Sequence, residues 1–214
     1  MFGIHFSTLR SILCLGAHSD DLEIGAGATV LKLIRNHPDI HVAWVVFSAP
    51  EPRAREARGA ASELLAGARA SEVILHEFPD SYFPHHWADI KDVFEKLKEN
   101  LNPDLVITHN TADRHQDHQV VGQLTWNTFR NQQILEYEIP KYDGDLGQPN
   151  LFVPASIGDA ERKIEIIKRN FKSQSERDWF DDSTFRGLMR IRGLESRAPD
   201  RLAEAFFARK VVLT

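Results

Sequence analysis

The sequence predicts a single α/β domain with a Rossmann-like, mostly parallel sheet and helices on both faces. Short, continuously apolar runs alternate with helical segments over the first two-thirds of the chain. Such runs are typical of strands that are buried on both faces of a parallel sheet. The length of 214 residues suits one domain, and no internal repeat, low-complexity tract or linker divides it. We therefore treat residues 1–214 as one unit.

The elements of the first two-thirds follow from apolar periodicity and from turn residues. Leu22, Ile24 and Val30 begin a series of apolar positions at helical spacing, and Pro52 suits the first turn of a helix. The apolar runs between the helical segments are too short for helices and are predicted to be strands. We expect strands over residues 11–16, 42–47, 72–78 and 104–108, and helices over residues 22–35, 52–65, 90–101 and 119–129.

The last third of the chain is less regular. Residues 141–150 hold two glycines, two aspartates and a proline, which predicts a loop. Residues 177–200 are polar and predict an irregular surface excursion. We expect the whole segment of about 141–200 to lie on the substrate side and to help select the substrate. The remaining elements expected here are strands over residues 134–139 and 206–213 and a helix over residues 157–171.

The composition narrows the classes of function. Hydrophobic residues make up 42% and charged residues 27%, so the chain is too apolar to be disordered. The net charge of −5 gives no electrostatic footprint for nucleic acid. The single cysteine, Cys14, excludes an internal disulfide framework and is expected to be a small buried residue. Ten histidines direct the search for a metal site toward His and carboxylate ligands.

The sequence carries no recognisable targeting segment. The first ten residues lack the basic start and long apolar stretch of a signal peptide. The longest apolar runs are far too short to span a bilayer. We therefore expect a cytoplasmic protein with no membrane span.

Two polar clusters directly follow predicted strands. Residues 17–23 read Ala-His-Ser-Asp-Asp-Leu-Glu, and residues 113–118 read Asp-Arg-His-Gln-Asp-His. Ligands bind beyond the carboxyl ends of strands in open α/β sheets, at the point where the strand order reverses. The two clusters are therefore expected to meet across one crevice, although they lie far apart in the chain.

Their residue types suit a catalytic metal site. Zinc in such a site takes three protein ligands from His, Asp and Glu and leaves one position for water. Two ligands from the first cluster and one from the second would satisfy that count. The remaining Asp and His side chains could then act as base and acid beside the metal.

At these residues the sequence resembles the LmbE-like, or PIG-L-like, family of zinc-dependent sugar N-deacetylases. The family motif Ala-His-Pro-Asp-Asp-x-Glu corresponds to residues 17–23, with Ser19 in place of the proline, and the motif His-x-Asp-His to residues 115–118. A serine can hold such a turn by local hydrogen bonds. The similarity covers about residues 11–130, and the C-terminal third matches only loosely. Shorter matches are the segments 53–56 (Arg-x-x-Glu), 78–80 (Phe-Pro-Asp) and 103–106 (Pro-Asp-x-Val).

The resemblance implies a role for each site residue. Asp20 would be the general base, and His115 would stabilise the oxyanion as an imidazolium and donate a proton. Asp117 would orient His115, while Arg53 and Asp80 would line the sugar pocket. The zinc ligands that the resemblance implies are His18, Asp21 and His118.

Each of these residues also has a purely structural interpretation. Asp20 followed by Glu23 fits a capping box, and Asp117 could cap the helix that follows it. Asp113 either shapes its loop or supports a ligand from outside. His115 and His118 could be exposed loop histidines, Arg53 a surface arginine, and Asp80 an ordinary turn residue.

Two further motifs are set aside. The pair His85–His86 invites a metal interpretation, but its nearest carboxylate is Asp89 and a surface loop is favoured. Residues 25–30 (Gly-Ala-Gly-Ala-Thr-Val) begin like a dinucleotide fingerprint. They lack the third glycine and follow the start of the first helix, so nucleotide-cofactor binding is rejected.

The leading hypothesis is a zinc-dependent hydrolase that removes the acetyl group from an N-acetylated amino sugar, such as N-acetylglucosamine, or from a sugar conjugate. One alternative keeps the metal but changes the substrate to another acylated amine. A second alternative is a non-catalytic sugar- or nucleotide-binding module on the same fold. The substrate itself and the oligomeric state, a homo-oligomer included, are left open by the sequence.

Overall fold

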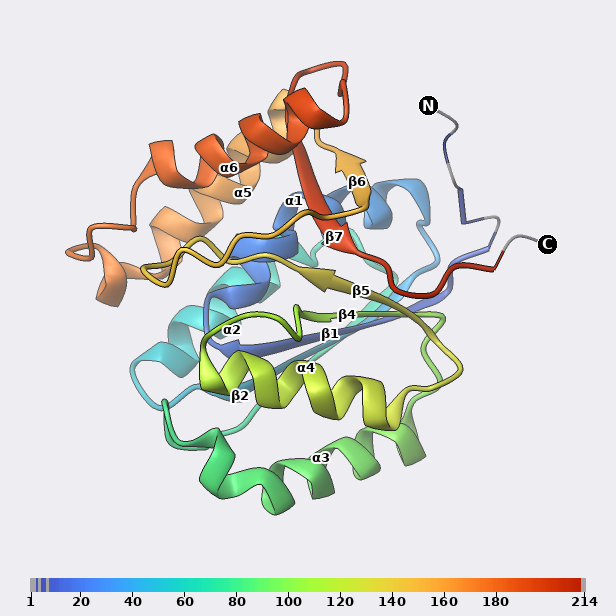
Figure 1. The fold of residues 1–214 in the computed structure, drawn as a ribbon, viewed down its shortest axis with the longest axis vertical. Coiled ribbons are helices and arrows are strands. Elements are labelled where there is room, and N and C mark those ends of the chain that lie inside the picture. Colours follow the sequence, from blue (N-terminus) through green and yellow to red (C-terminus); the bar gives the residue numbers. More distant parts are fainter. Residues whose placement is uncertain (1–2, 4, 7, 213–214) are drawn as a thin grey trace.

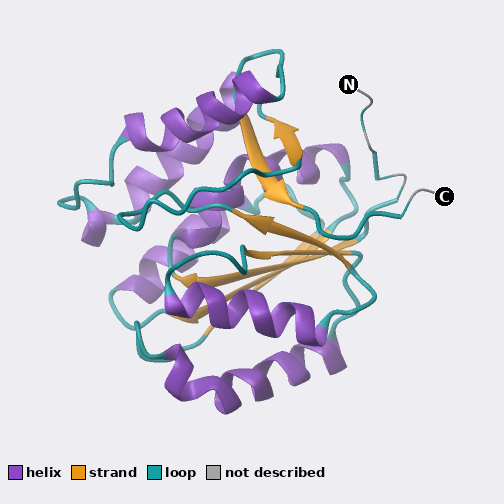
Figure 2. Ribbon diagram, in the orientation of Figure 1, coloured by secondary structure: helices purple, strands orange, loops and turns teal. Residues whose placement is uncertain are grey.

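A seven-stranded, mostly parallel sheet forms the centre of the computed structural model, which describes residues 3, 5–6 and 8–212 (Figures 1 and 2). Its strand order is β3-β2-β1-β4-β5-β7-β6. The first five strands in the chain are parallel, as the sequence predicts. Their bounds are β1 (Ser11–His18), β2 (His41–Ser48), β3 (Ala70–Leu75), β4 (Leu105–His109) and β5 (Gln133–Tyr137).

Two short strands complete the sheet in the antiparallel direction. Strand β7 (Ala203–Phe207) pairs with β5, and β6 (Leu151–Pro154) pairs with β7. The sequence analysis missed β6, which has four residues, ends in proline and is half-buried throughout, so it carries no clear apolar pattern. The closing strand expected over residues 206–213 starts earlier and ends at Phe207, and residue 213 lies outside the described residues.

Helices cover both faces of the sheet (Figure 1). Apolar side chains from four helices form one buried cluster with the sheet, and those of the other two form a second on its opposite face. The first layer contains α1 (Asp21–Asn36), α2 (Arg53–Leu64), α5 (Ile157–Asn170) and α6 (Asp182–Glu195). The second layer contains α3 (Trp87–Asn100), preceded by the 3₁₀ turn η1 (Phe83–His86), and α4 (Gln116–Thr128).

The prediction of an irregular surface segment over residues 177–200 is wrong, because α6 occupies most of that range. Phe185 and Met189 are buried one helical turn apart, as an amphipathic helix requires. The next residue on that face is Arg192, which is buried because its guanidinium pairs with Glu138 at 2.6 Å. Because a charged residue occupies this core position, the apolar periodicity of the helix is interrupted and the sequence pattern does not indicate it. The loop over residues 141–150 is present as expected.

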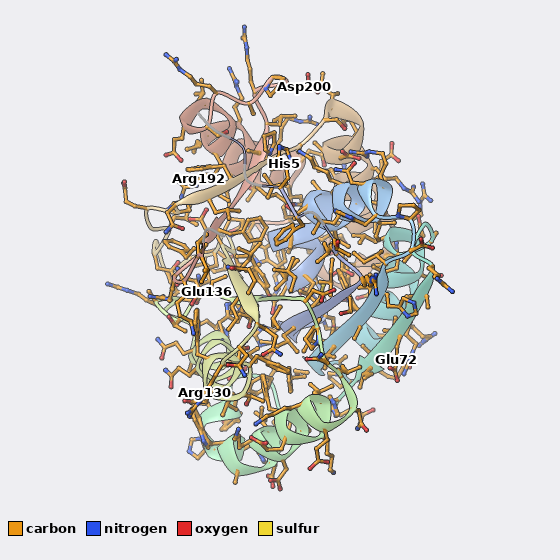
Figure 3. The ribbon with its side chains drawn as sticks, turned by 90° about the vertical axis from the view of Figure 1, so that its right-hand side faces the viewer. His5, Glu72, Arg130, Glu136, Arg192 and Asp200 are labelled. Atoms are coloured by element: carbon orange, nitrogen blue, oxygen red, sulfur yellow. The ribbon has the colours of Figure 1, made fainter. Side chains whose placement is uncertain are left out.

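The strand order reverses between β1 and β4, which are neighbours at the centre of the sheet. The chain steps outward from β1 to β2 and β3 on one side and from β4 to β5 on the other. The carboxyl ends of β1 and β4 therefore flank the crevice in which such sheets bind ligands. Figure 3 looks onto the opposite edge, where Glu72 lies near the start of β3 and Arg130 just before β5.

Candidate active site

The two polar clusters meet at the carboxyl edge of the sheet, as expected. His18 is the last residue of β1, and Asp21 is the first residue of α1. His118 lies in the first turn of α4, which follows β4 after a short loop. All three side chains are almost fully buried. The two histidines approach to 3.2 Å between His118 Nε2 and His18 Nδ1, although a hundred residues separate them.

Three ligand-type atoms form a nearly equilateral triangle. His18 Nδ1 lies 3.3 Å from Asp21 Oδ2, and His118 Nε2 lies 3.5 Å from the same oxygen. The third side is the 3.2 Å separation of the two histidine nitrogens. Tetrahedral zinc with bonds of about 2.0–2.1 Å places its ligand atoms about 3.3 Å apart. The donor set and its spacing therefore fit a tetrahedral metal ion.

Each histidine of the triangle is held through its other ring nitrogen. His118 Nδ1 lies 2.9 Å from Asp113 Oδ2, and His18 Nε2 lies 3.1 Å from Asp117 Oδ2. Ring N–H groups that donate to these carboxylates leave the opposite nitrogens as free electron pairs facing Asp21. Outer carboxylates of this kind orient metal-binding histidines and raise their basicity. Asp113 thus supports a ligand-type histidine, the second of the two roles considered for it.

The contact expected between the Asp117 carboxylate and His115 is absent. Oxygens of that carboxylate instead accept from His18 and from the backbone N–H groups of Ser81 and Phe83, at 2.6 and 3.1 Å. The N-cap of α4 is His115, whose Nδ1 accepts from the Asp117 backbone N–H at 3.2 Å. Asp117 therefore orients His115 through its backbone and His18 through its side chain, and the helix-cap interpretation of its carboxylate is wrong.

Asp20 lies at the N-cap of α1, but its side chain makes no capping hydrogen bond. One carboxylate oxygen, Oδ1, instead accepts from the Arg53 guanidinium at 2.6 Å. The other, Oδ2, is buried and has no hydrogen-bond partner among the described residues. The capping box is therefore not formed. Burial raises the pKa of Asp20, and the charge of Arg53 opposes that effect.

Serine replaces the family proline without loss of the turn. Ser19 is fully buried, and its hydroxyl donates to the Ser48 carbonyl at the end of β2, at 3.4 Å. The turn is closed by the His18 backbone N–H, which donates to Asp21 Oδ2 at 2.6 Å. These contacts fix the position of both ligand-type residues relative to the sheet.

His115 and Asp80 lie beside the triangle and are more exposed than its three members. The His115 ring stacks on His118, with ring centroids 4.6 Å apart. Burial lowers the pKa of His115, and the neighbouring His118 and His18 rings lower it further. The Asp80 carboxylate lies 3.3 Å from His18 Nε2, yet its side chain is 56% exposed. Both residues can therefore meet a ligand that enters from solvent.

His109 is a site residue that the sequence analysis missed. It ends β4, is fully buried, and places Nε2 3.1 Å from Asp21 Oδ2. The same nitrogen lies 2.9 Å from the Ala17 backbone N–H and 2.9 Å from the Tyr137 hydroxyl. Because the Ala17 backbone N–H donates to Nε2, the electron pair of that nitrogen is used, and His109 lies beside Asp21 without completing the triangle. Its place at the carboxyl end of a central strand is the signal that could have found it.

The pair His85–His86 lies apart from the site, in the turn η1. His86 Nδ1 contacts the carboxylate of Asp89 at 3.3 Å, and the Asp89 side chain is exposed. The two histidines belong to none of the groups of potential metal ligands within the described part of the chain. The surface interpretation of this pair agrees with these contacts.

Comparison with known proteins links these residues to one family. The sequence model of the family described as "PIG-L: GlcNAc-PI de-N-acetylase" matches residues 13–129, which include both clusters. The chain is also 32% identical over 144 residues to the uncharacterized deacetylase YaiS of Escherichia coli K12. That match covers 61% of this chain and 75% of the E. coli protein.

Solved structures share the fold at low sequence identity. N,N'-diacetylchitobiose deacetylase from Pyrococcus horikoshii superposes with a TM-score of 0.67 at 19% identity, over 94% of this chain and 84% of that protein. GalB, the 4-carboxy-2-hydroxymuconate hydratase of Pseudomonas putida KT2440, superposes with a TM-score of 0.68 at 16% identity, over 96% and 98%. The α/β fold predicted from the sequence is confirmed, and it occurs with more than one chemistry.

Proposed function

The chain belongs to the PIG-L (GlcNAc-PI de-N-acetylase) family, and on that premise we propose that it is a zinc-dependent N-deacetylase of an N-acetylated amino sugar or sugar conjugate. The observation that carries the proposal is the triangle of ligand-type atoms at the carboxyl edge of the sheet, with a carboxylate behind each histidine. Two similarities support this substrate class. The matched family is described as a GlcNAc-PI de-N-acetylase, and an N,N'-diacetylchitobiose deacetylase shares the fold.

In the proposed site, His18, Asp21 and His118 hold the zinc ion. When bound there, zinc would polarise the acyl carbonyl and make a water molecule acidic enough to react near neutral pH. His18 and His118 keep the correct nitrogens free because Asp117 and Asp113 hold the opposite N–H groups. Asp21 is held in turn by the His18 backbone N–H, which donates to its Oδ2.

Asp20 is proposed as the general base. Its Oδ1 is held by Arg53, so the unpartnered Oδ2 is the oxygen that accepts the proton of the attacking water. Burial raises the pKa of Asp20, which brings the carboxylate closer to the range in which a base both accepts and returns a proton. The proton that Asp20 accepts is then available for the leaving amine nitrogen.

His115 is proposed to stabilise the oxyanion as a neutral hydrogen-bond donor. Its Nδ1 accepts from the Asp117 backbone N–H, so a neutral ring carries its proton on Nε2. Burial, His118 and His18 lower its pKa, which disfavours the imidazolium expected from the sequence. A fixed N–H donor aimed at developing charge lowers the barrier without a change of protonation state. Arg53 and the exposed Asp80 remain proposed contacts of the sugar.

The hydratase with this fold shows why fold alone does not decide the reaction. An amidohydrolase acting on another acylated amine and a non-catalytic binding module are the alternatives.

None of the helices in the described part of the chain has both the length and the apolar character that a membrane span requires. A cytoplasmic location remains a prediction.

A panel of N-acetylated sugars tests the proposal, starting with N-acetylglucosamine and including a nucleotide sugar and a glycolipid headgroup. Purified protein, stripped of metal and then reloaded with zinc, should release free amine from at least one member only when loaded. Asp20→Asn should keep its zinc and lose about 10²-fold or more in kcat/KM, the usual contribution of a general base. Free-amine release by the Asp20→Asn protein at the native rate, or none from any N-acetyl sugar by zinc-loaded native protein, would contradict the proposal.

A further inference from the structure

We propose that Lys141 is a positioning residue of the metal centre, acting through Asp113 on His118. Lys141 belongs to the loop over residues 141–150, outside both motifs, and the family match ends before it. The inference rests on the proposed function, because it assumes that His118 is a zinc ligand. It adds a residue from the C-terminal third to a site that the family motifs place in the first two-thirds.

A continuous chain of polar contacts links Lys141 to the triangle. The Lys141 ammonium donates to Asp113 Oδ2 at 2.9 Å and to the carboxylate of Asp145 at 2.7 Å. Asp113 Oδ2 also lies 2.9 Å from His118 Nδ1. The other oxygen, Asp113 Oδ1, accepts from the His115 backbone N–H at 2.8 Å. The Asp113 carboxylate thus connects Lys141 to Nδ1 of the His118 ring and to the backbone of His115, which is the N-cap of α4.

The burial of these groups separates them from ordinary surface ion pairs. The side chains of Lys141, Asp113 and Asp145 are only 13%, 4% and 6% exposed. Exposed pairs contribute little because water and salt screen them, whereas an unpaired buried charge is costly. Lys141 is therefore held in place between two buried carboxylates, and its position fixes the position of Asp113.

The tautomer and orientation of the His118 ring depend on the position of the Asp113 carboxylate. A carboxylate that is free to rotate can turn its oxygens away from Nδ1, and the imidazole then loses its fixed tautomer and orientation. Lys141 opposes that rotation together with the His115 N–H on Oδ1, since the ammonium binds the same oxygen that faces His118. Asp145, the second carboxylate that binds the Lys141 ammonium, also accepts from the Arg114 backbone N–H at 2.7 Å. Zinc affinity should therefore depend on a loop residue that does not reach the metal.

The test measures the zinc dissociation constant by competition with a chromogenic chelator, not by activity. Lys141→Met keeps most of the apolar stem and removes the ammonium, and it should bind zinc about 10- to 100-fold more weakly, the usual cost of losing an outer support. Asp113→Asn should weaken zinc binding at least as much. The double variant should be no weaker than Asp113→Asn, because Lys141 acts through that carboxylate. Asp143→Asn, an exposed neighbour in the same loop, is the matched control and should bind zinc normally.

Native zinc affinity in a folded Lys141→Met protein would overturn the inference, and so would additive losses in the double variant. Should Lys141→Met fail to fold, Asp145→Asn removes the negative charge beside the ammonium and keeps an amide oxygen that can accept from the Arg114 backbone N–H. Its zinc affinity should fall several-fold, and an unchanged affinity would equally overturn the inference. Failure of the native protein to bind zinc would instead contradict the proposed function, so the two failures are distinguishable.

Discussion

Asp117 illustrates how one residue can serve a site in a way that its sequence motif does not reveal. Within residues 115–118, Asp117 was expected to act on His115, its neighbour in the motif. In the folded chain its carboxylate lies behind His18, a residue from the other motif. Two backbone N–H groups, of Ser81 and Phe83, also donate to it. The segment that follows β3 thus holds the Asp117 carboxylate in place, and that carboxylate in turn orients His18.

This arrangement predicts that Asp117→Asn weakens zinc binding. The amide offers one oxygen where the carboxylate accepts three hydrogen bonds with two, so His18 or a backbone N–H loses its partner. We expect zinc affinity to fall about 10- to 100-fold in a chelator competition. Asp104→Asn, which alters a carboxylate bound to backbone N–H groups at the opposite sheet edge, is the control. Unchanged zinc affinity with a lowered kcat would show that Asp117 works through His115 alone.

Strand-end positions predicted that the two polar clusters meet, whereas the roles proposed for individual residues came from the family resemblance. Both clusters follow strands, so His18, Asp21 and His118 could be expected to meet. Contacts between distant segments could not be predicted in the same way. His109 directly follows the strand predicted over residues 104–108, and Lys141 lies inside a polar loop. Only the three-dimensional arrangement shows that His109 lies beside Asp21 and that Lys141 contacts Asp113.

At the scale of elements, α1 is packed unusually closely against its surroundings. A Cβ on Gly25 would overlap the ring of Tyr137, and one on Gly27 would press on the stem of Lys163. Tyr137 cannot move away freely, because its hydroxyl donates to the Leu15 carbonyl at 2.9 Å. The glycines that resemble a dinucleotide fingerprint therefore serve close helix packing. They keep the first turn of α1, with Asp20 and Asp21, against the sheet.

Gly25→Ala should lower the free energy of unfolding by about 1–3 kcal/mol, the usual cost of overpacking a core. Gly187→Ala is the matched control, since it is also a glycine inside a helix but its Cβ would meet nothing within 4 Å. That change should stabilise the protein by about 0.5–1 kcal/mol through helix propensity. Chemical denaturation measures both variants. Equal effects of the two substitutions would contradict the packing argument for α1.

Periodicity predicted the elements whose inner faces are mostly apolar. The first five strands and the five helices α1 to α5 were found in this way, although α5 also buries Lys163. Helix α6 was missed because Arg192 occupies a core position, and β6 because four half-buried residues carry no pattern. A buried ion pair such as Arg192–Glu138 depends on a partner far away in the chain, which local periodicity cannot detect.

At the scale of the whole molecule, the C-terminal third holds the catalytic edge in place. Lys163 of α5 is buried, and its ammonium donates to the Ile24 carbonyl of α1 at 2.6 Å and to Glu204 of β7 at 2.7 Å. Glu204 in turn accepts from the Ala28 and Thr29 backbone N–H groups of α1, at 3.0 and 2.7 Å. Glu204 thus has a structural role, because it holds the helix that carries Asp21 against the sheet.

We propose that His18, Asp21 and His118 hold a zinc ion at the switch point of the sheet. A crystal grown with zinc and measured at the zinc absorption edge tests this proposal. We expect one anomalous peak at about 2.0–2.2 Å from His18 Nδ1, Asp21 Oδ2 and His118 Nε2. A peak among Asp80, His115 and Asp117, a peak that includes His109 in place of His18, or no peak at the switch point would contradict it.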